Sequence, residues 1–183
     1  MAEKRFNILM IGGNARKSGK TSMICRLLGY YGKNYSIAAV KVALYDDWEI
    51  FREHYPEASE SGYLEIKENN PENRKDSGKF LTAGAAESWF ISAASGNEDR
   101  VLQKIMDIED QIDWMILESN VMRKYIDPGL FVMVNHSGKE MKASAKELSP
   151  FADLHVSTGS EIFENIESYI GIENDKWNII HPL

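Results

Sequence analysis

The octapeptide at residues 14–21, Asn-Ala-Arg-Lys-Ser-Gly-Lys-Thr, constrains the fold of this chain more than any other feature. It follows a short apolar run at residues 5–11 and two glycines, and apolar side chains recur at helical spacing after it: Ile24, Leu27, Leu28 and Tyr31. This pattern predicts a strand, a tight polar loop and a helix that stops at Gly32. A further apolar and β-branched run at residues 36–44 predicts a parallel strand that is buried on both faces.

The chemistry of the octapeptide follows from its last three residues, Gly-Lys-Thr, which end a Walker A motif. Such a loop turns backbone N–H groups toward phosphate oxygens at a helix start, while Lys20 reaches the β- and γ-phosphates and the Thr21 hydroxyl coordinates Mg²⁺. The motif begins with glycine, and this chain has Asn14 there, a residue type that enters left-handed backbone conformations at modest cost. The predicted phosphate-binding residues are Asn14, Lys17, Ser18, Gly19, Lys20, Thr21 and Ser22.

Carboxylates at the ends of two other apolar runs are candidate metal ligands and catalytic groups. Glu118 ends the run at residues 114–117, in the position where a Walker B acid holds Mg²⁺. Asp46 and Asp47 follow the second strand, at the edge where open α/β sheets place their ligands. We predict Asp46 as a metal ligand and Asp47, with Lys20, as a catalytic residue; the alternative is that both aspartates are ordinary turn formers.

Base recognition is weakly signalled, because the Asn-Lys-x-Asp pattern of GTPases is absent. Asn135 follows a predicted strand at residues 130–134, and Ser157 and Thr158 follow a later one. These three side chains are candidate contacts to a purine edge, although Asn and Ser at strand ends are more often turn formers.

Strand and helix signals alternate along the rest of the chain. We predict strands at residues 88–94, 114–117, 130–134, 154–156 and 177–180. Helices are predicted at residues 76–86, 101–112, 142–148 and 160–169, with a short one that ends at Tyr125. This order predicts an α/β protein with the three-layer P-loop NTPase fold and a mostly parallel central sheet, as a single nucleotide-binding domain over residues 1–183.

Charge is distributed unevenly. The chain carries 21 Lys and Arg and 28 Asp and Glu, a net charge of −7, which argues against nucleic acid as a partner. Residues 1–35 carry seven bases and one acid, and a small anion is the ligand that this excess favours. Residues 45–76 carry ten acids and four bases among several turn signals, with a short strand at 63–66. We predict an acidic insertion or lid there; by its composition alone the segment fits a solvated, partly mobile insertion better.

Several classes of protein are excluded by what the sequence lacks. The single cysteine, Cys25, forms no internal disulfide or thiolate cluster and is predicted to be a buried packing residue. No apolar run approaches the roughly 18 residues that cross a bilayer, and the N-terminal run is shorter than the apolar part of a signal peptide, about 7–15 residues. We therefore expect a cytoplasmic protein without a membrane partner.

The chain resembles the MobB family, P-loop GTP-binding proteins associated with the synthesis of molybdopterin guanine dinucleotide. The similarity spans about residues 5–135 and includes the phosphate loop, Lys-Asp-Ser at 75–77, Ala-Gly-Ala at 83–85 and the strand that ends at Glu118. The chain departs from the family's pattern at Asn14, at Ser119 and after Lys41. The resemblance implies GTP as the nucleotide and a homodimer. The residues to which it assigns a role are Gly19, Lys20 and Thr21 for phosphate, Glu118 for metal chemistry, and Asp76 and Ser77 as a functional loop.

Three functions fit these observations. The first is a Mg²⁺-dependent purine nucleotide-binding protein, with GTP preferred to ATP, that hydrolyses nucleotide slowly and acts as an adaptor for a protein partner in molybdenum cofactor assembly. The second is a small-molecule kinase in which the acidic segment covers the substrate and Asp47 or Asp76 accepts a hydroxyl proton. The third is a module that binds nucleotide without turnover.

Overall fold

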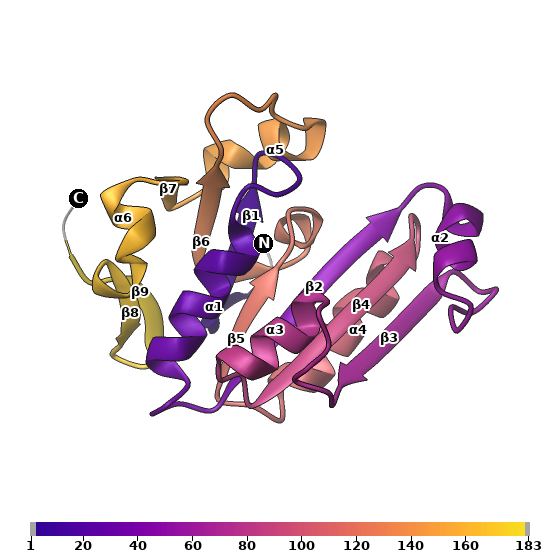
Figure 1. Ribbon diagram of the computed structural model, residues 1–183, viewed down its shortest axis with the longest axis horizontal. Helices are drawn as coiled ribbons and strands as arrows, with labels where there is room; N and C mark the ends of the chain where they lie inside the picture. Colours follow the sequence, from indigo (N-terminus) through magenta and orange to yellow (C-terminus); the bar gives the residue numbers. More distant parts are fainter. Residues whose placement is uncertain (1–2, 182–183) are drawn as a thin grey trace.

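A computed structural model describes residues 3–181 of the protein, built around a seven-stranded sheet (Figure 1). The strand order is β3-β4-β2-β5-β1-β6-β7, and all neighbours pair in parallel except β3 and β4. The sheet strands are β1 (Lys4–Gly13), β2 (Ile37–Tyr45), β3 (Tyr63–Glu68), β4 (Glu87–Ala94), β5 (Trp114–Glu118), β6 (Asp127–Asn135) and β7 (Leu154–Ser157). Two further strands, β8 (Ile170–Glu173) and β9 (Lys176–Ile179), form a separate antiparallel pair.

Helices cover both faces of the sheet. The α-helices are α1 (Lys20–Tyr31), α2 (Trp48–His54), α3 (Asp76–Ala83), α4 (Glu98–Glu109), α5 (Ala143–Leu148) and α6 (Glu161–Glu164). The 3₁₀ helices are η1 (Val121–Lys124), η2 (Ser149–Phe151) and η3 (Ile166–Ser168). Within residues 3–181 no helix combines the length and the apolar character that crossing a membrane would require.

Alternation along the strands explains the three layers. In β1, Leu9 and Ile11 face the core under α1, α3 and η3, whereas Ile8 and Met10 face the core under α4 and α5. All four side chains are fully buried, as expected for a parallel strand with a helix layer on each side. The predicted α/β fold with a mostly parallel central sheet is confirmed, and the octapeptide follows β1, an interior strand of the sheet, and leads into α1.

The acidic segment at residues 45–76 contains regular structure. It forms α2 and the antiparallel edge strand β3, which includes the strand predicted at residues 63–66. Trp48 and Phe51 of α2 are buried in a small cluster with Leu64 of β3. The sequence pattern missed α2 because this helix has only seven residues. A role of the segment as a lid stays a prediction.

The C-terminal part of the chain differs from the prediction. The strand predicted at residues 177–180 is β9, but it pairs with β8 rather than with the central sheet. Asn174 and Asp175, both left-handed with φ of 52° and 56°, form the two-residue turn between them, as Asn and Asp do in hairpins. The helix predicted at residues 160–169 is divided into α6 and η3 because Asn165 between them has a non-helical φ of −129°.

Two glycines in and after α1 allow a matched test of packing. Gly32, directly after the helix, has a φ of −62°, but a Cβ there would lie 2.4 Å from the carbonyl oxygen of Gly84. Gly29 is exposed inside the helix, and its Cβ would meet nothing closer than 3.8 Å. Gly32 therefore ends α1, as predicted, and lets the ends of α1 and α3 approach each other.

We expect Gly32→Ala to destabilise the protein by about 1–3 kcal/mol, because the added methyl group overpacks this contact. Gly29→Ala, the matched control, should stabilise it by about 0.5–1 kcal/mol through helix propensity. Chemical denaturation of both variants measures the two shifts. Equal effects of the two substitutions would contradict the close approach.

Candidate functional site

The loop between β1 and α1 presents backbone groups at the start of α1. Gly19 is the N-cap residue of α1, with a left-handed φ of 96°, and its position carries no side-chain cap. Lys17 is also left-handed, with a φ of 54°, so the loop changes direction twice within three residues. The N–H groups of the first helical turn, together with the helix dipole, favour an anion at this point.

Asn14 anchors the loop on β6. Its backbone N–H donates to the Val134 carbonyl at 3.0 Å, and its side-chain amide both donates to the His136 carbonyl at 3.1 Å and accepts from the His136 N–H at 3.0 Å. The left-handed conformation expected of Asn14 is not observed; among the non-glycine residues of this loop it occurs at Lys17. Because the N–H of Asn14 is used in this anchor, Asn14 fixes the loop rather than presenting its amide to a ligand.

Side chains from three other parts of the chain also hold the loop. The amide of Asn120 accepts from the N–H of Gly13 at 2.8 Å and donates to its carbonyl at 3.0 Å. The Thr158 hydroxyl donates to the Ser18 carbonyl at 2.7 Å, and the Lys139 ammonium donates to two further loop carbonyls at 2.9 and 3.0 Å. Contacts from distant parts of the chain therefore help to fix the loop conformation.

A cluster of charged side chains lies beside the loop, centred on Glu118 at the end of β5. One Glu118 oxygen, Oε1, is 3.7 Å from Lys20 Nζ and 3.4 Å from Lys41 Nζ. Lys41 also forms an ion pair with Asp76 at the start of α3, and Asp76 Oδ1 is 3.1 Å from Lys79 Nζ. Sheet register causes this arrangement, since Glu118 and Lys41 are directly paired between β5 and β2.

The lysines of this cluster differ in their protonation equilibria. Burial lowers the pKa of Lys20, and the positive charge of the neighbouring Lys41 lowers it further. The negative charge of Glu118 raises this pKa but does not cancel the effect of burial. Burial also opposes the charge of Lys41, but Glu118 and Asp76 together raise its pKa. The carboxyl pKa of Asp76 is lowered despite burial, because Lys41 donates a hydrogen bond to it. Of Lys20 and Lys41, Lys20 is thus the one whose positive charge the protein disfavours, and an anionic ligand would stabilise that charge.

The residues at this site fit a magnesium ion. Glu118 is buried, and its second oxygen, Oε2, has no hydrogen-bond partner within residues 3–181. Thr21, in the first turn of α1, lines the same cavity as Glu118. One carboxylate and one hydroxyl are the kind of ligands that Mg²⁺ takes from a protein when phosphates and water complete its shell.

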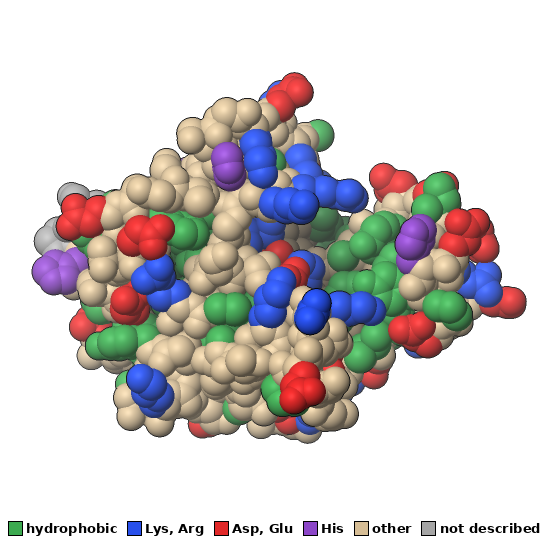
Figure 2. Space-filling view, viewed as in Figure 1, with side chains coloured by type: hydrophobic (Ala, Val, Ile, Leu, Met, Phe, Trp, Pro, Cys, Tyr) green, Lys and Arg blue, Asp and Glu red, His purple; other side chains and the backbone are tan. Residues whose placement is uncertain are grey.

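A cavity of ≈ 1090 Å³ lies over the loop, and we call it the loop cavity. Its volume is at the upper end of the range of about 300–1,000 Å³ for small-molecule sites. Figure 2 shows Lys and Arg side chains gathered around the hollow in the middle of this face. Residues that line the cavity and carry its chemistry are Lys17, Gly19, Lys20, Thr21, Lys41 and Glu118. Ser18 and Ser22 of the predicted phosphate-binding set line it as well.

The structure does not bring Asp46 and Asp47 into the loop cavity. The Asp46 carboxylate accepts a hydrogen bond from the Ser95 hydroxyl at 2.6 Å. Asp47 is the N-cap of α2, where its carboxylate accepts from the Ile50 N–H at 3.1 Å. Both residues follow β2 as predicted, but the chain enters α2 there, and neither side chain lines the loop cavity.

The other predicted residues are spread around the site. Asn135 lies beside His155, at 3.3 Å between side-chain nitrogens, and Ser157 is exposed and does not line the loop cavity. Ser77 is buried and donates to Glu68 at 3.0 Å, whereas its neighbour Asp76 belongs to the charged cluster.

Cys25 was predicted to be a buried packing residue. It is only partly buried, and it lines the loop cavity.

Sequence reasoning missed three residues of the site: Lys41, Asn120 and Lys142. Lys41 carries a visible signal, because it is a lone charge in the middle of an otherwise apolar strand. Asn120 and Lys142 lie in connecting segments, and only the fold shows that Asn120 binds Gly13 and that Lys142 lines the cavity. Burial lowers the pKa of Lys142, and the positive charges of Lys20 and Arg16 lower it further.

No protein-family model matches this chain, and no curated protein matches it either. Among solved structures, the protein is similar to the kinase domain of Escherichia coli tyrosine kinase ETK. The two chains are 15% identical and superpose with a TM-score of 0.44, over 85% of this chain and 70% of the kinase domain.

Proposed function

We propose that the protein binds a Mg²⁺–purine nucleoside triphosphate in the loop cavity and hydrolyses it slowly. The observation that carries this proposal is that Lys20 and Glu118 lie in one cavity at the start of α1, and that one oxygen of the Glu118 carboxylate, Oε2, has no hydrogen-bond partner within residues 3–181. A cation and a metal-binding carboxylate at a helix N-terminus together match a polyphosphate with its metal.

Binding would rearrange the charged cluster. The N–H groups around Gly19 would contact phosphate oxygens, and Lys20 would leave Glu118 for the β- and γ-phosphates. Glu118 and the Thr21 hydroxyl would hold Mg²⁺, whose role when bound is to offset phosphate charge. Lys41, whose charge is stabilised by Asp76, would face the terminal phosphate. Asp47 is occupied as a helix cap and has no part in this proposal, so no carboxylate is assigned to activate water and turnover is slow.

The finer role rests on the resemblance to MobB proteins. It supports GTP rather than ATP, a homodimer, and an adaptor function with a protein partner in molybdopterin guanine dinucleotide synthesis in the cytoplasm. Asn135 and Ser157 remain candidate contacts for the base, whereas the Thr158 hydroxyl is used to hold Ser18.

A specific observation also favours the second candidate function, a small-molecule kinase. A smaller cavity adjoins the loop cavity and shares Lys41 and Asp76 with it. An acceptor bound there would lie beside the position proposed for the terminal phosphate. Stimulation of turnover by an acceptor distinguishes the kinase from the slow hydrolase, and the complete absence of turnover indicates a binding module.

We expect Lys20→Ala to weaken triphosphate binding by at least about tenfold while the fold stays intact, because this ammonium contacts phosphate rather than the core. Lys33→Ala, an exposed lysine just beyond α1, is the matched control and should bind like the parent. Titration calorimetry measures both affinities. Parental affinity in Lys20→Ala would refute the loop as the nucleotide site.

We expect Glu118→Gln to weaken Mg²⁺-dependent turnover by about tenfold or more, because the amide keeps the shape but loses the charge at the metal. Metal-free nucleotide should bind Glu118→Gln at least as well as the parent, since a negative charge near the phosphates is removed. Glu109→Gln, which changes a buried glutamate that pairs with Arg5 elsewhere, is the matched control. Equal losses with and without Mg²⁺ would exclude the metal role.

We expect GTP to displace a labelled purine triphosphate at lower concentration than ATP does. The expectation rests on the MobB resemblance, since the GTPase base motif is absent from the sequence. Competition titrations with Mg²⁺ present measure the ratio. A clear preference for ATP would favour the kinase function instead.

A further inference from the structure

A second cavity, of ≈ 340 Å³, adjoins the loop cavity on the side of β3 and β4. The two cavities share Lys41, Ala43, Tyr45 and Asp76, so the charged cluster forms part of the boundary between them. The volume is at the lower end of the range of about 300–1,000 Å³ for small-molecule sites. We call it the aromatic cavity, after the rings of Tyr45, Tyr55 and Phe90 that line it.

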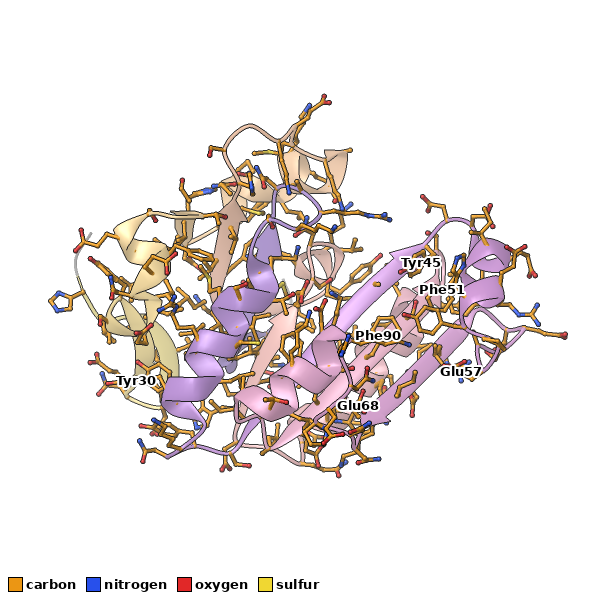
Figure 3. The ribbon with its side chains drawn as sticks, viewed as in Figure 1. Tyr30, Tyr45, Phe51, Glu57, Glu68 and Phe90 are labelled. Carbon is orange, nitrogen blue, oxygen red and sulfur yellow. The ribbon has the colours of Figure 1, made fainter. Side chains whose placement is uncertain are left out.

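The rings that build this cavity pack on one another. Phe51 of α2 lies between Tyr45 and Tyr55, with ring centroids 4.5 Å from each, and it is stacked on Tyr55 at an interplanar angle of 11°. Tyr55 in turn lies 5.7 Å from Phe90 of β4. Figure 3 shows Tyr45, Phe51 and Phe90 together in the region between α2 and α3, and Figure 2 shows hydrophobic side chains on this side of the hollow, opposite the basic ones. A wall of mutually packed rings is rigid and favours a planar, ring-containing ligand.

Glu68 is the buried carboxylate of the aromatic cavity, and its hydrogen bonds are made within the protein. The Glu68 carboxylate accepts hydrogen bonds from the backbone N–H groups of Asn69 and Asn70 and from the side chains of Asn73 and Ser77. These hydrogen bonds overcome the effect of burial and lower the carboxyl pKa of Glu68. Glu68 therefore keeps its negative charge, but its acceptor positions are occupied by the loop before α3.

Lys75 places a positively charged ammonium group at the aromatic cavity. Its ammonium lies 4.3 Å from the centroid of the Tyr55 ring, and within residues 3–181 it forms no ion pair. Asp76, the other acid of this cavity, is already paired with Lys41 and Lys79. The formal charges of the four ionic side chains that line the cavity, Lys41, Glu68, Lys75 and Asp76, sum to zero. Within residues 3–181, however, Lys75 is the one among them with neither an ion pair nor a hydrogen bond to its charged group, and it can pair with an anionic substituent on the ligand.

We propose that the aromatic cavity binds a small planar ring compound that carries a carboxylate or a similar anionic group. The inference deepens the proposed function, because it rests on the loop cavity holding the nucleotide and makes this compound the second ligand beside it. The ring packs against Phe90 and its neighbours, and the anionic group faces Lys75.

The test is a titration with 2-naphthoate, a planar bicyclic carboxylate with its own fluorescence. We expect saturable binding, about tenfold tighter than that of cyclohexanecarboxylate, which has the charge without the flat ring, and of 2-naphthamide, which has the ring without the charge. The proposal would be overturned by non-saturable binding of 2-naphthoate. It would also be overturned if either comparison compound bound as tightly as 2-naphthoate.

Two pairs of variants locate the binding site. Ile66 is paired with Phe90 across β3 and β4, and it lines the aromatic cavity but not the loop cavity. The larger side chain in Ile66→Trp should fill the aromatic cavity and weaken 2-naphthoate binding by about tenfold. Ile50→Trp, on the exposed face of α2, is its control. Lys75→Glu reverses a charge at an exposed position and should weaken binding similarly, whereas Lys33→Glu, also at an exposed position, should not. Unchanged binding in both Ile66→Trp and Lys75→Glu would refute this location.

Mg²⁺–GTP titrations of the same proteins separate this inference from the proposed function. Ile66→Trp should bind Mg²⁺–GTP within about twofold of the parent, because Ile66 does not line the loop cavity. A parent protein that binds 2-naphthoate but no nucleotide would refute the proposed function and leave an aromatic-anion site. A parent that binds nucleotide but not 2-naphthoate would refute the second site alone.

Discussion

The buried carboxylate of Glu118, shared between Lys20 and Lys41, is the interaction on which the rest of the site depends. Two ammonium groups within 4 Å of one carboxylate oxygen repel each other, and Asp76 offsets this repulsion from the other side of Lys41. Removing several charges from water costs free energy that ion pairing only partly returns. Without a ligand, these four groups are therefore balanced in charge but poor contributors to stability, which is the usual property of residues kept for binding.

The order of the strands creates this arrangement. β5 lies between β2 and β1, so Glu118 is paired with Lys41 on one side and with Ile11, just before the loop, on the other. In a parallel sheet all these strands end at the same edge, where α1 also begins. The loop is then held by contacts from the segments after β5, β6 and β7, among them the Asn120 amide and the Thr158 hydroxyl. A motif that is local in sequence thus takes its shape from residues more than 100 positions away.

How far the sequence predicts this site depends on the range of the interactions. The loop and Glu118 could be found because a strand, its terminal residue and the following turn are local patterns. Lys41 could not be assigned from the pattern alone, because its role requires the register between strands that are distant in the chain. Asp47 directly follows the strand region as the sequence indicated, but its catalytic role was predicted from that position alone, and the direction of its side chain is determined by the helix that it caps. Acidic composition alone gave no indication of the aromatic packing around Phe51.

The Lys41–Asp76 ion pair connects the two cavities mechanically as well as electrostatically. Asp76 is the first residue of α3, and the preceding loop, held by Glu68, carries Lys75 over the Tyr55 ring. A triphosphate that attracts Lys41 would weaken its bond to Asp76, and the start of α3 and this loop would then be free to adjust. A ligand that orders the loop in the aromatic cavity would in turn fix Asp76 and hold Lys41 in place. Because linkage is reciprocal, each ligand would change the affinity of the other by the same factor, whichever of them binds first.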